Sequence, residues 1–261
     1  MTLTERASSR ILDWEGCHNV RDLGGLETSD GHRVRWGALV RSDLPTRLTD
    51  RGRQTLLDHG IRTVLDLRFP GEISRDWDDY PFQDESGRAS VGYINVPFNH
   101  GRDPELDEQV HAAYRSATSR LELNRHDIDW NQVGIASAVR AIADAPPGGV
   151  LVHCHAGKDR TGAVVALVLS TLGVADEDIA DDYALTALTI EPLIVDWLDE
   201  NSTNDEEREY LRALAMPVRE AMLDTLAYMR ERHGSAEAFL LGGGMTSEQI
   251  SALRGRLLED A

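Results

Sequence analysis

The sequence is poor in cysteine and in long apolar segments. Its two cysteines, Cys17 and Cys154, lie too far apart to form a disulfide framework, which favours a reducing compartment. The longest strongly apolar stretch, residues 163–169, is far shorter than the ~20 residues of a membrane span. Residues 1–16 contain no apolar core of a signal peptide. We therefore expect a cytoplasmic protein without stable membrane insertion.

Basic residues are scarce relative to acidic ones. The chain has 45 acidic and 27 basic residues and a net charge of −18. Such a surface repels nucleic acid unless basic side chains converge on one spot, so no nucleic-acid partner is expected. Any anionic substrate must meet a local positive pocket. Of the 27 basic residues, 26 are arginines and one is a lysine, Lys158. This exception invites a chemical explanation.

The composition is otherwise that of an ordinary folded protein, with 41% hydrophobic residues in 261. That fraction excludes intrinsic disorder, and the length favours one domain over residues 1–261. Short apolar, β-branched runs at residues 61–67, 93–98 and 150–152 predict buried strands. Because helical patterns separate these runs, we predict an α/β fold with a central, mainly parallel sheet flanked by helices.

The rest of the chain is predicted to be mostly helical. From Thr161 the sequence is apolar on every side and then reaches Gly173, which describes a buried helix. Residues 176–261 read as a helical elaboration. Residues 99–131, with a helical piece around 109–125, form a long connection of the kind that often makes a lid over a site.

The loop between the strand at 150–152 and the buried helix carries the chemistry. It reads His-Cys-His-Ala-Gly-Lys-Asp-Arg-Thr-Gly over residues 153–162. A loop from the end of a buried strand into a helix N-terminus is where open α/β sheets bind ligands. Its backbone N–H groups and the helix dipole favour a phosphate.

Each residue type in this loop suits phosphate chemistry. The loop amides and nearby cations would stabilise a Cys154 thiolate, which is a nucleophile. Arg160 can hold two phosphate oxygens at once. Ala156 and Gly157 let the backbone approach those oxygens. Thr161 can donate a hydrogen bond to the sulfur when it leaves.

Other readings of nearby residues stay open. His153 and His155 flank Cys154, but alternation at a strand end points them apart, so we expect no metal and no other cofactor. Cys17 is read as a small buried hydrophobe, with a redox partner of Cys154 as the alternative. Two roles are open for Lys158: it contacts the negative charge of the substrate, or it is a cation on the surface of the loop.

Cys-x5-Arg followed by Thr-Gly resembles the cysteine-dependent protein tyrosine phosphatases. The fuller string resembles their atypical bacterial branch, whose members act on phosphotyrosine, often on phosphoserine or phosphothreonine, and in some cases on phosphoinositides. Asn19-Val20-Arg21-Asp22-Leu23-Gly24-Gly25 is similar to the N-terminal signature of that branch. The resemblance implies a phosphotyrosine-phosphatase-like fold. The phosphate-binding residues that it implies are His155, Ala156, Gly157, Lys158, Asp159, Arg160 and Thr161.

The general acid cannot be carried over from the resemblance. Some relatives place an acid just after a Pro-Phe pair, where this chain has Asn99 and His100 and no carboxylate before Asp103. Asp159 lies inside the loop and is the first candidate. His100 or Asp103 would serve if their segment folds over the site. Asp66 is the last candidate and reads more readily as a residue that orders arginines beneath the loop.

The sequence thus predicts a phosphatase that forms a cysteinyl-phosphate intermediate. The expected partner is a phosphorylated protein, lipid or small molecule. One alternative is a lipid or small-molecule phosphatase on the same scaffold, and a second is a phospho-binding module with weak catalysis. Sulfur or arsenate chemistry on a Cys-x5-Arg loop is a third.

Overall fold

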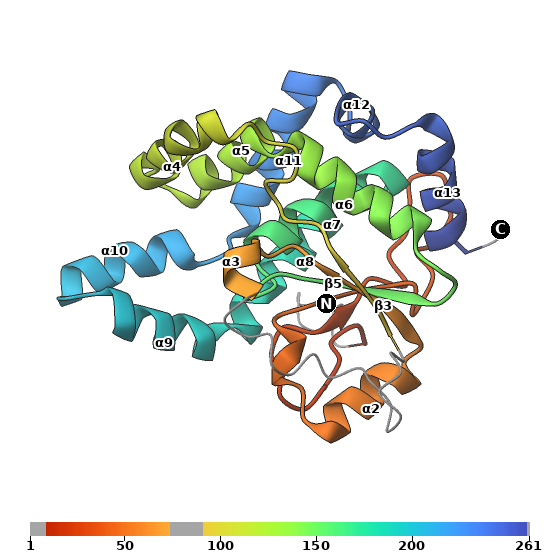
Figure 1. Ribbon diagram of the computed structural model, residues 1–261, viewed down its shortest axis with the longest axis horizontal. Helices are drawn as coiled ribbons and strands as arrows, with labels where there is room; N and C mark the ends of the chain where they lie inside the picture. Colours follow the sequence, from red (N-terminus) through yellow and green to blue (C-terminus); the bar gives the residue numbers. More distant parts are fainter. Residues whose placement is uncertain (1–8, 74–90, 260–261) are drawn as a thin grey trace.

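A computed structural model describes residues 9–73 and 91–259, with helices arranged around a central sheet (Figure 1). The strands are β1 (Arg21–Asp22), β2 (Leu39–Ser42), β3 (Ile61–Asp66), β4 (Gly92–Asn95) and β5 (Gly149–His153). The helices before the phosphate loop are α2 (Asp50–Asp58), α3 (Pro70–Ile73), α4 (Asp107–Ser116), α5 (Arg120–Trp130) and α6 (Gln132–Asp144). Those after it are α7 (Asp159–Leu172), α8 (Asp176–Thr189), α9 (Glu191–Asn201), α10 (Asp205–Ala215), α11 (Arg219–His233), α12 (Ala236–Gly242) and α13 (Ser247–Leu257). The described residues also form the short 3-10 helices η1 (Pro45–Arg47) and η3 (Pro104–Leu106).

The sheet has the order β1-β2-β5-β3-β4. Only β1 runs antiparallel to its neighbour, while β5 is parallel to both β2 and β3. The predicted fold class, α/β with a mainly parallel sheet, is confirmed. Because β5 is central, the loop that follows it lies between the carboxyl ends of two parallel neighbours.

Helices cover both faces of the sheet, with α6 and α7 on one face and α2 on the other (Figure 1). The alternation of side chains along β5 explains how one strand serves both layers. Val150 and Val152 join the large core under α6 and α7, and Leu151 joins a smaller core that includes Leu56 of α2. All three side chains are fully buried.

Helix α7 is buried on nearly every side, as its apolar sequence predicts. It begins at Asp159, two residues before the expected start at Thr161, because the loop already turns into helical backbone there. It ends at Leu172 and is capped by Gly173, whose φ of +87° suits glycine and whose N–H donates to the Leu169 and Ser170 carbonyl oxygens.

The connection at residues 99–131 differs from expectation. Instead of one helical piece it holds two helices, α4 and α5. Ala117 leaves the helical conformation, and the Ser119 side chain accepts a hydrogen bond from the Glu122 amide, which starts a new helix. The break lets the two helices pack against each other.

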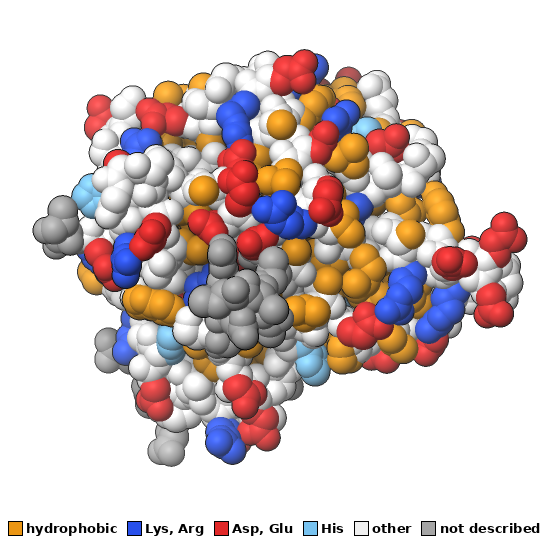
Figure 2. All heavy atoms as spheres, turned by 180° about the vertical axis from the view of Figure 1, so that it is seen from behind, with side chains coloured by type: hydrophobic (Ala, Val, Ile, Leu, Met, Phe, Trp, Pro, Cys, Tyr) orange, Lys and Arg blue, Asp and Glu red, His pale blue; other side chains and the backbone are white. Residues whose placement is uncertain are grey.

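Helices α9 and α10 form a hairpin that projects from the body of the molecule (Figure 1). It has a small core of its own, which consists of Ile190, Ile194, Leu198 and Ala215. Figure 2 shows acidic side chains gathered at its tip, where α10 begins with Asp205, Glu206 and Glu207. None of the helices in the described ranges is long and apolar enough to cross a membrane.

Candidate active site

The phosphate loop joins β5 to α7 at the carboxyl edge of the sheet. Cys154 directly follows β5 and is 3% exposed. Gly157 has a φ of +64°, and a Cβ atom there would lie 2.3 Å from the carbonyl oxygen of Ser42. Only glycine therefore lets the loop lie directly against the end of β2.

The backbone N–H groups of the loop are available to an anion. Within residues 9–73 and 91–259, no acceptor takes a hydrogen bond from the amides of residues 156–160. The N-cap of α7, Lys158, makes no side-chain capping bond. A row of such donors at a helix N-terminus favours a bound phosphate.

Arg160 is oriented by a carboxylate that the sequence did not point to. Its Nη1 and Nη2 donate to the two carboxylate oxygens of Glu72 in α3, at 2.5 and 2.9 Å. Its guanidinium also lies 5.1 Å from the ring centroid of Phe69. A guanidinium has five N–H groups, so the Glu72 pair leaves three for phosphate oxygens. Burial opposes the charge on Arg160, but Cys154 and Glu72 outweigh it and raise the pKa of Arg160.

Asp159 sits between two cations. Its carboxylate lies 2.8 Å from Arg120 Nη1 and 3.3 Å from Lys158 Nζ. Burial opposes ionisation of Asp159, but Arg120 and Lys158 outweigh burial and hold its pKa below the usual range. Both cations also donate to the last carbonyls of α10, Lys158 to Ala215 at 2.8 Å and Arg120 to Leu214. The carboxylate is therefore ionised in the free protein.

A cavity of about 720 Å³ opens over the loop. Arg120 and Leu123 of α5 reach it, whereas α9 and α10 provide most of the wall beyond the loop. The apolar residues on this side of the cavity are Ile190, which precedes α9, with Leu193, Ile194, Trp197, Leu211, Leu214 and Ala215. Asp196 and Glu200 of α9 also line the cavity, which thus combines a cationic floor with a wall that is mostly apolar but carries two carboxylates.

The other candidate acids lie elsewhere. Asp66 is fully buried and accepts hydrogen bonds from Arg68 and Tyr93. Burial opposes its ionisation, but His153 and Arg68 outweigh burial and lower the pKa of Asp66. Asp103 caps η3 through the Glu105 amide. Neither Asp103 nor His100 is among the residues that line the cavity.

Asp127 is a buried carboxyl near the site that sequence reasoning missed. Tyr114 Oη donates to its Oδ1 at 2.6 Å. Burial, with the nearby charge of Asp159, raises the pKa of Asp127 to about 7. The polar spacing of Arg120, Asn124 and Asp127 on one face of α5 was the signal that could have found it.

The two cysteines have different surroundings. Both are free, and Cys17 is half-buried with its Sγ 3.5 Å from the Leu44 carbonyl oxygen. Burial and Asp43 raise the pKa of the Cys17 thiol, which makes it a weak nucleophile at neutral pH. No group of three or more histidine, cysteine, aspartate or glutamate residues in the described ranges is placed to hold a metal ion.

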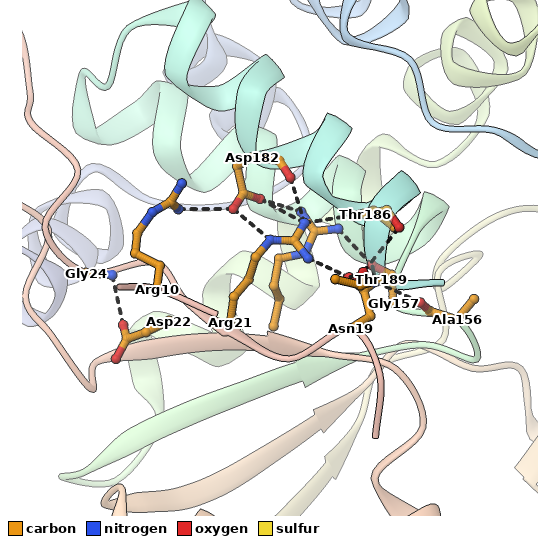
Figure 3. Close-up of polar contacts among 11 residues, drawn as sticks. Arg10, Asn19, Arg21, Asp22, Gly24, Ala156, Gly157, Asp182, Thr186 and Thr189 are labelled. Carbon is orange, nitrogen blue, oxygen red and sulfur yellow. Dashed lines mark hydrogen bonds and ion pairs between the residues drawn. The ribbon is translucent and has the colours of Figure 1, made fainter. Parts of the chain in front are cut away.

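The N-terminal signature lies behind the loop (Figure 3). Asn19 Nδ2 donates to the carbonyl oxygens of Ala156 and Gly157, at 2.9 and 3.1 Å. Asp22 has a separate task, since its carboxylate accepts hydrogen bonds from the amides of Gly24 and Gly37. The signature therefore supports the loop and a neighbouring turn rather than lining the cavity.

Comparison with known proteins matches the tyrosine phosphatase family over residues 12–259. The triple specificity protein phosphatase PtpB of Mycobacterium tuberculosis is 28% identical, over 95% of this chain and 99% of that protein. A tyrosine-protein phosphatase of Nostoc commune is 26% identical, over 84% of this chain and 74% of that protein. A crystal structure of P. aeruginosa TpbA in complex with pTyr matches with a TM-score of 0.40 and 14% identity, over 82% of this chain and 91% of that chain, a likeness too slight to add support. The family match covers nearly the whole chain, which therefore belongs to the tyrosine phosphatase family.

Proposed function

We propose that the protein hydrolyses phosphomonoesters, foremost phosphotyrosine, through a phosphorylated Cys154. The observation that carries this proposal is the set of groups around one cavity floor. Cys154 lies there with the amides of residues 156–160, which bond no acceptor within the described ranges, and with the N–H groups of Arg160 that Glu72 leaves available. A nucleophile beneath a cradle of donors is what transfer of a phosphoryl group requires.

The reaction proceeds in two displacements. In the first, the Cys154 thiolate attacks phosphorus, the bond from phosphorus to the ester oxygen breaks, and an acid protonates that oxygen. In the second, water attacks the cysteinyl phosphate, the conjugate base of the acid takes a proton from the water, and the thiolate leaves. The loop amides and Arg160 stabilise the charge on the phosphoryl oxygens in both steps. No step requires a metal ion.

We assign the proton donor to Asp159. In the free protein Arg120 and Lys158 keep it ionised. A bound phosphate dianion competes for these two cations and places negative charge beside the carboxylate. Both effects raise the affinity of Asp159 for a proton. Substrate binding itself therefore favours the protonated form of Asp159, which is the form that can donate a proton.

The cavity wall favours an aromatic ester. Ile190, Leu193 and Leu214 offer apolar contact to the ring of phosphotyrosine above the loop. Phosphoserine, phosphothreonine and phosphoinositide headgroups are the second candidates, and the name of the Mycobacterium tuberculosis relative, a triple specificity protein phosphatase, supports a site that accepts more than one kind of substrate. A comparison of kcat/KM for phosphotyrosine and for these second candidates ranks the substrates.

We also propose that residues 1–261 act as one phosphatase domain in the cytoplasm.

The nucleophile is tested with Cys154→Ser and with Cys17→Ser as the matched control. Cys154→Ser should abolish turnover of p-nitrophenyl phosphate, while calorimetry should still detect orthophosphate, because the amides and Arg160 remain. Cys17→Ser should keep normal turnover. If Cys154→Ser retained more than a few per cent of the activity, the nucleophile would be another residue.

The acid is tested by the pH dependence of kcat for Asp159→Asn, with His100→Ala and Asp103→Asn as comparisons. The donor's variant should lose the alkaline limb of the profile. It should also lose more activity on phosphoserine than on p-nitrophenyl phosphate, since an alkoxide needs a proton more than a phenolate does. An unchanged limb and substrate ratio in Asp159→Asn would remove the role from Asp159.

A further inference from the structure

Behind the phosphate loop, arginines from the N-terminal part of the chain meet one carboxylate of α8 (Figure 3). Asp182 Oδ1 lies 2.9 Å from Arg21 Nε and 3.1 Å from Arg10 Nη1. Its Oδ2 lies 2.7 Å from Arg41 Nη1. The Asp182, Arg21 and Arg41 side chains are each 1% exposed. Arg10 is 9% exposed, so the centre of the cluster is sealed from solvent and its edge nearly so.

The charges of this cluster do not balance. Three guanidinium groups surround one carboxylate, and Asp182 is the sole carboxylate that pairs with them in the part of the chain that the structure describes. Burial and the neighbouring Arg41 lower the pKa of Arg21 to about 10. Burial opposes the charge on Asp182, but Arg21 and Arg41 outweigh it and lower the pKa of Asp182. The arginines can share this space only because Asp182 is ionised.

Two chains of hydrogen bonds lead from Asp182 to the loop. Arg41, held by Asp182 through Nη1, donates from Nη2 to the Gly157 carbonyl oxygen at 2.7 Å. Arg21, held through Nε, donates from Nη1 to Asn19 Oδ1 at 2.5 Å. Asn19 in turn donates to the Ala156 and Gly157 carbonyl oxygens.

The planar peptide bond links the position of each held carbonyl group to the direction of the next N–H group, which faces the anion site. In a trans peptide the C=O and the N–H point in opposite directions. The Ala156 carbonyl shares a peptide with the Gly157 amide, and the Gly157 carbonyl shares one with the Lys158 amide. Side chains that hold both carbonyl groups from behind therefore turn these two amides away from themselves, toward the cavity.

We infer that Asp182 is the positioning residue of the phosphate loop, acting through Arg41 and through Arg21 with Asn19 to aim the amides of Gly157 and Lys158 at the substrate phosphate. Asp182 touches no substrate. The inference rests on the proposed function, because it names what orders the site of that reaction. It also explains why Asn19 and Arg21 occur together in the N-terminal signature.

Asp182→Asn separates positioning from simple electrostatics. The variant loses a negative charge near a site for an anion, so charge alone predicts tighter phosphate binding. Positioning predicts the opposite, because a carboxamide cannot pair with three guanidinium groups, so Arg41 and Arg21 are held less firmly behind the loop carbonyls. We expect the Kd for vanadate and orthophosphate, and KM for p-nitrophenyl phosphate, to rise about tenfold, on the order of one charge-assisted hydrogen bond.

The matched control is Asp181→Asn. Asp181 is the preceding residue of α8, and its Oδ1 pairs with Arg219 Nε at 2.6 Å. A structural role alone would lower Tm in either variant and leave the Kd of the folded fraction unchanged. Asp182→Glu keeps the charge and should recover part of the affinity. Where Asp182→Asn does not fold, Asn19→Ala decides, since it removes one of the two chains of donors to the loop and leaves Asp182 with its arginines in place.

The inference is overturned if folded Asp182→Asn, or Asn19→Ala in its stead, binds vanadate as tightly as the unchanged protein or more tightly. It is supported if affinity falls in that variant and stays in Asp181→Asn. Failure of the proposed function looks different, because the unchanged protein would then lack turnover of every phosphomonoester tested. Calorimetry with orthophosphate measures anion binding at the loop independently of turnover.

Discussion

The phosphate loop is held in different ways on its two sides. On the cavity side, Arg160 pairs with Glu72 and Arg120 pairs with Asp159, and these carboxylate side chains are 32% and 38% exposed. On the buried side, Asp182 and its arginines are sealed from solvent. Partly exposed ion pairs exchange partners at little cost, whereas a broken buried pair leaves an uncompensated charge. We therefore expect the loop to keep its shape from behind and to exchange partners in front when a phosphate binds.

The largest effect is expected where the cavity side meets the reacting phosphoryl group. Arg160→Lys should lower kcat about 100-fold or more, nearly as much as Arg160→Ala, because an ammonium cannot donate two parallel hydrogen bonds. Arg53→Lys, at an exposed pair with Asp50, is the control and should be silent. A near-normal kcat in Arg160→Lys would show that bidentate contact is not needed.

Gly157→Ala tests how rigidly the loop is held against β2. The added Cβ would collide with the Ser42 carbonyl at a φ of +64°, so both phosphate affinity and Tm should fall, the latter on the order of 5 °C. Gly31→Ala is the control, since Gly31 has a φ of +90° but open space around it. Equal losses of Tm in the two variants would mean that backbone strain alone, and not the contact with β2, limits this position.

Glu72→Gln should have a smaller effect on the cavity side. The amide keeps the shape of the side chain but loses the charge that orients Arg160, so kcat/KM should fall about tenfold with little change in Tm. Glu27→Gln, at the exposed pair with Arg33, is the comparison. An unchanged kcat/KM would show that Arg160 finds its position without Glu72.

Asp127→Asn should change turnover least and reveal a pH dependence of stability. The folded pKa of Asp127, about 7, lies above its unfolded value near 3.8. Its contribution to stability is therefore complete below pH 3.8 and is lost as the pH rises through 7. Between pH 5 and pH 8 the unchanged protein should lose more Tm than Asp127→Asn does, so the Tm of the variant should rise relative to that of the unchanged protein. A difference in Tm that stays constant over this pH range would mean that Asp127 is ionised in the folded protein. Asp58→Asn is the control, because Asp58 is an exposed acid.

The sequence predicted the parts of the site that are local in the chain. The strand at 150–152, the loop and the buried helix follow one another directly, so their periodicity and the Cys-x5-Arg spacing were enough. The tight turn at Gly157 also follows from residue type. The predicted strand at 93–98 ends at Asn95 in the structure, because Pro97 has no N–H group to donate to a neighbouring strand.

Partners that lie far apart in the chain escaped prediction. Arg21 and Asp182 are 161 residues apart, and Glu72 and Arg160 are 88 apart. Each is one of many charged residues in an acidic chain, and nothing in the local pattern tells a buried partner from a solvated one. The break that makes α4 and α5 two helices was also missed, because the Ser119 cap competes with a helical pattern that continues through it.

The central claim is that Cys154 carries the phosphoryl group between the two displacements. Acid quenching during turnover of p-nitrophenyl phosphate, followed by mass spectrometry of the peptides, tests it most directly. The account predicts the added mass of one phosphoryl group on the peptide that contains Cys154, and its absence from the same peptide in Cys154→Ser. Full turnover without phosphocysteine, or with the phosphoryl group on another side chain, would contradict the account.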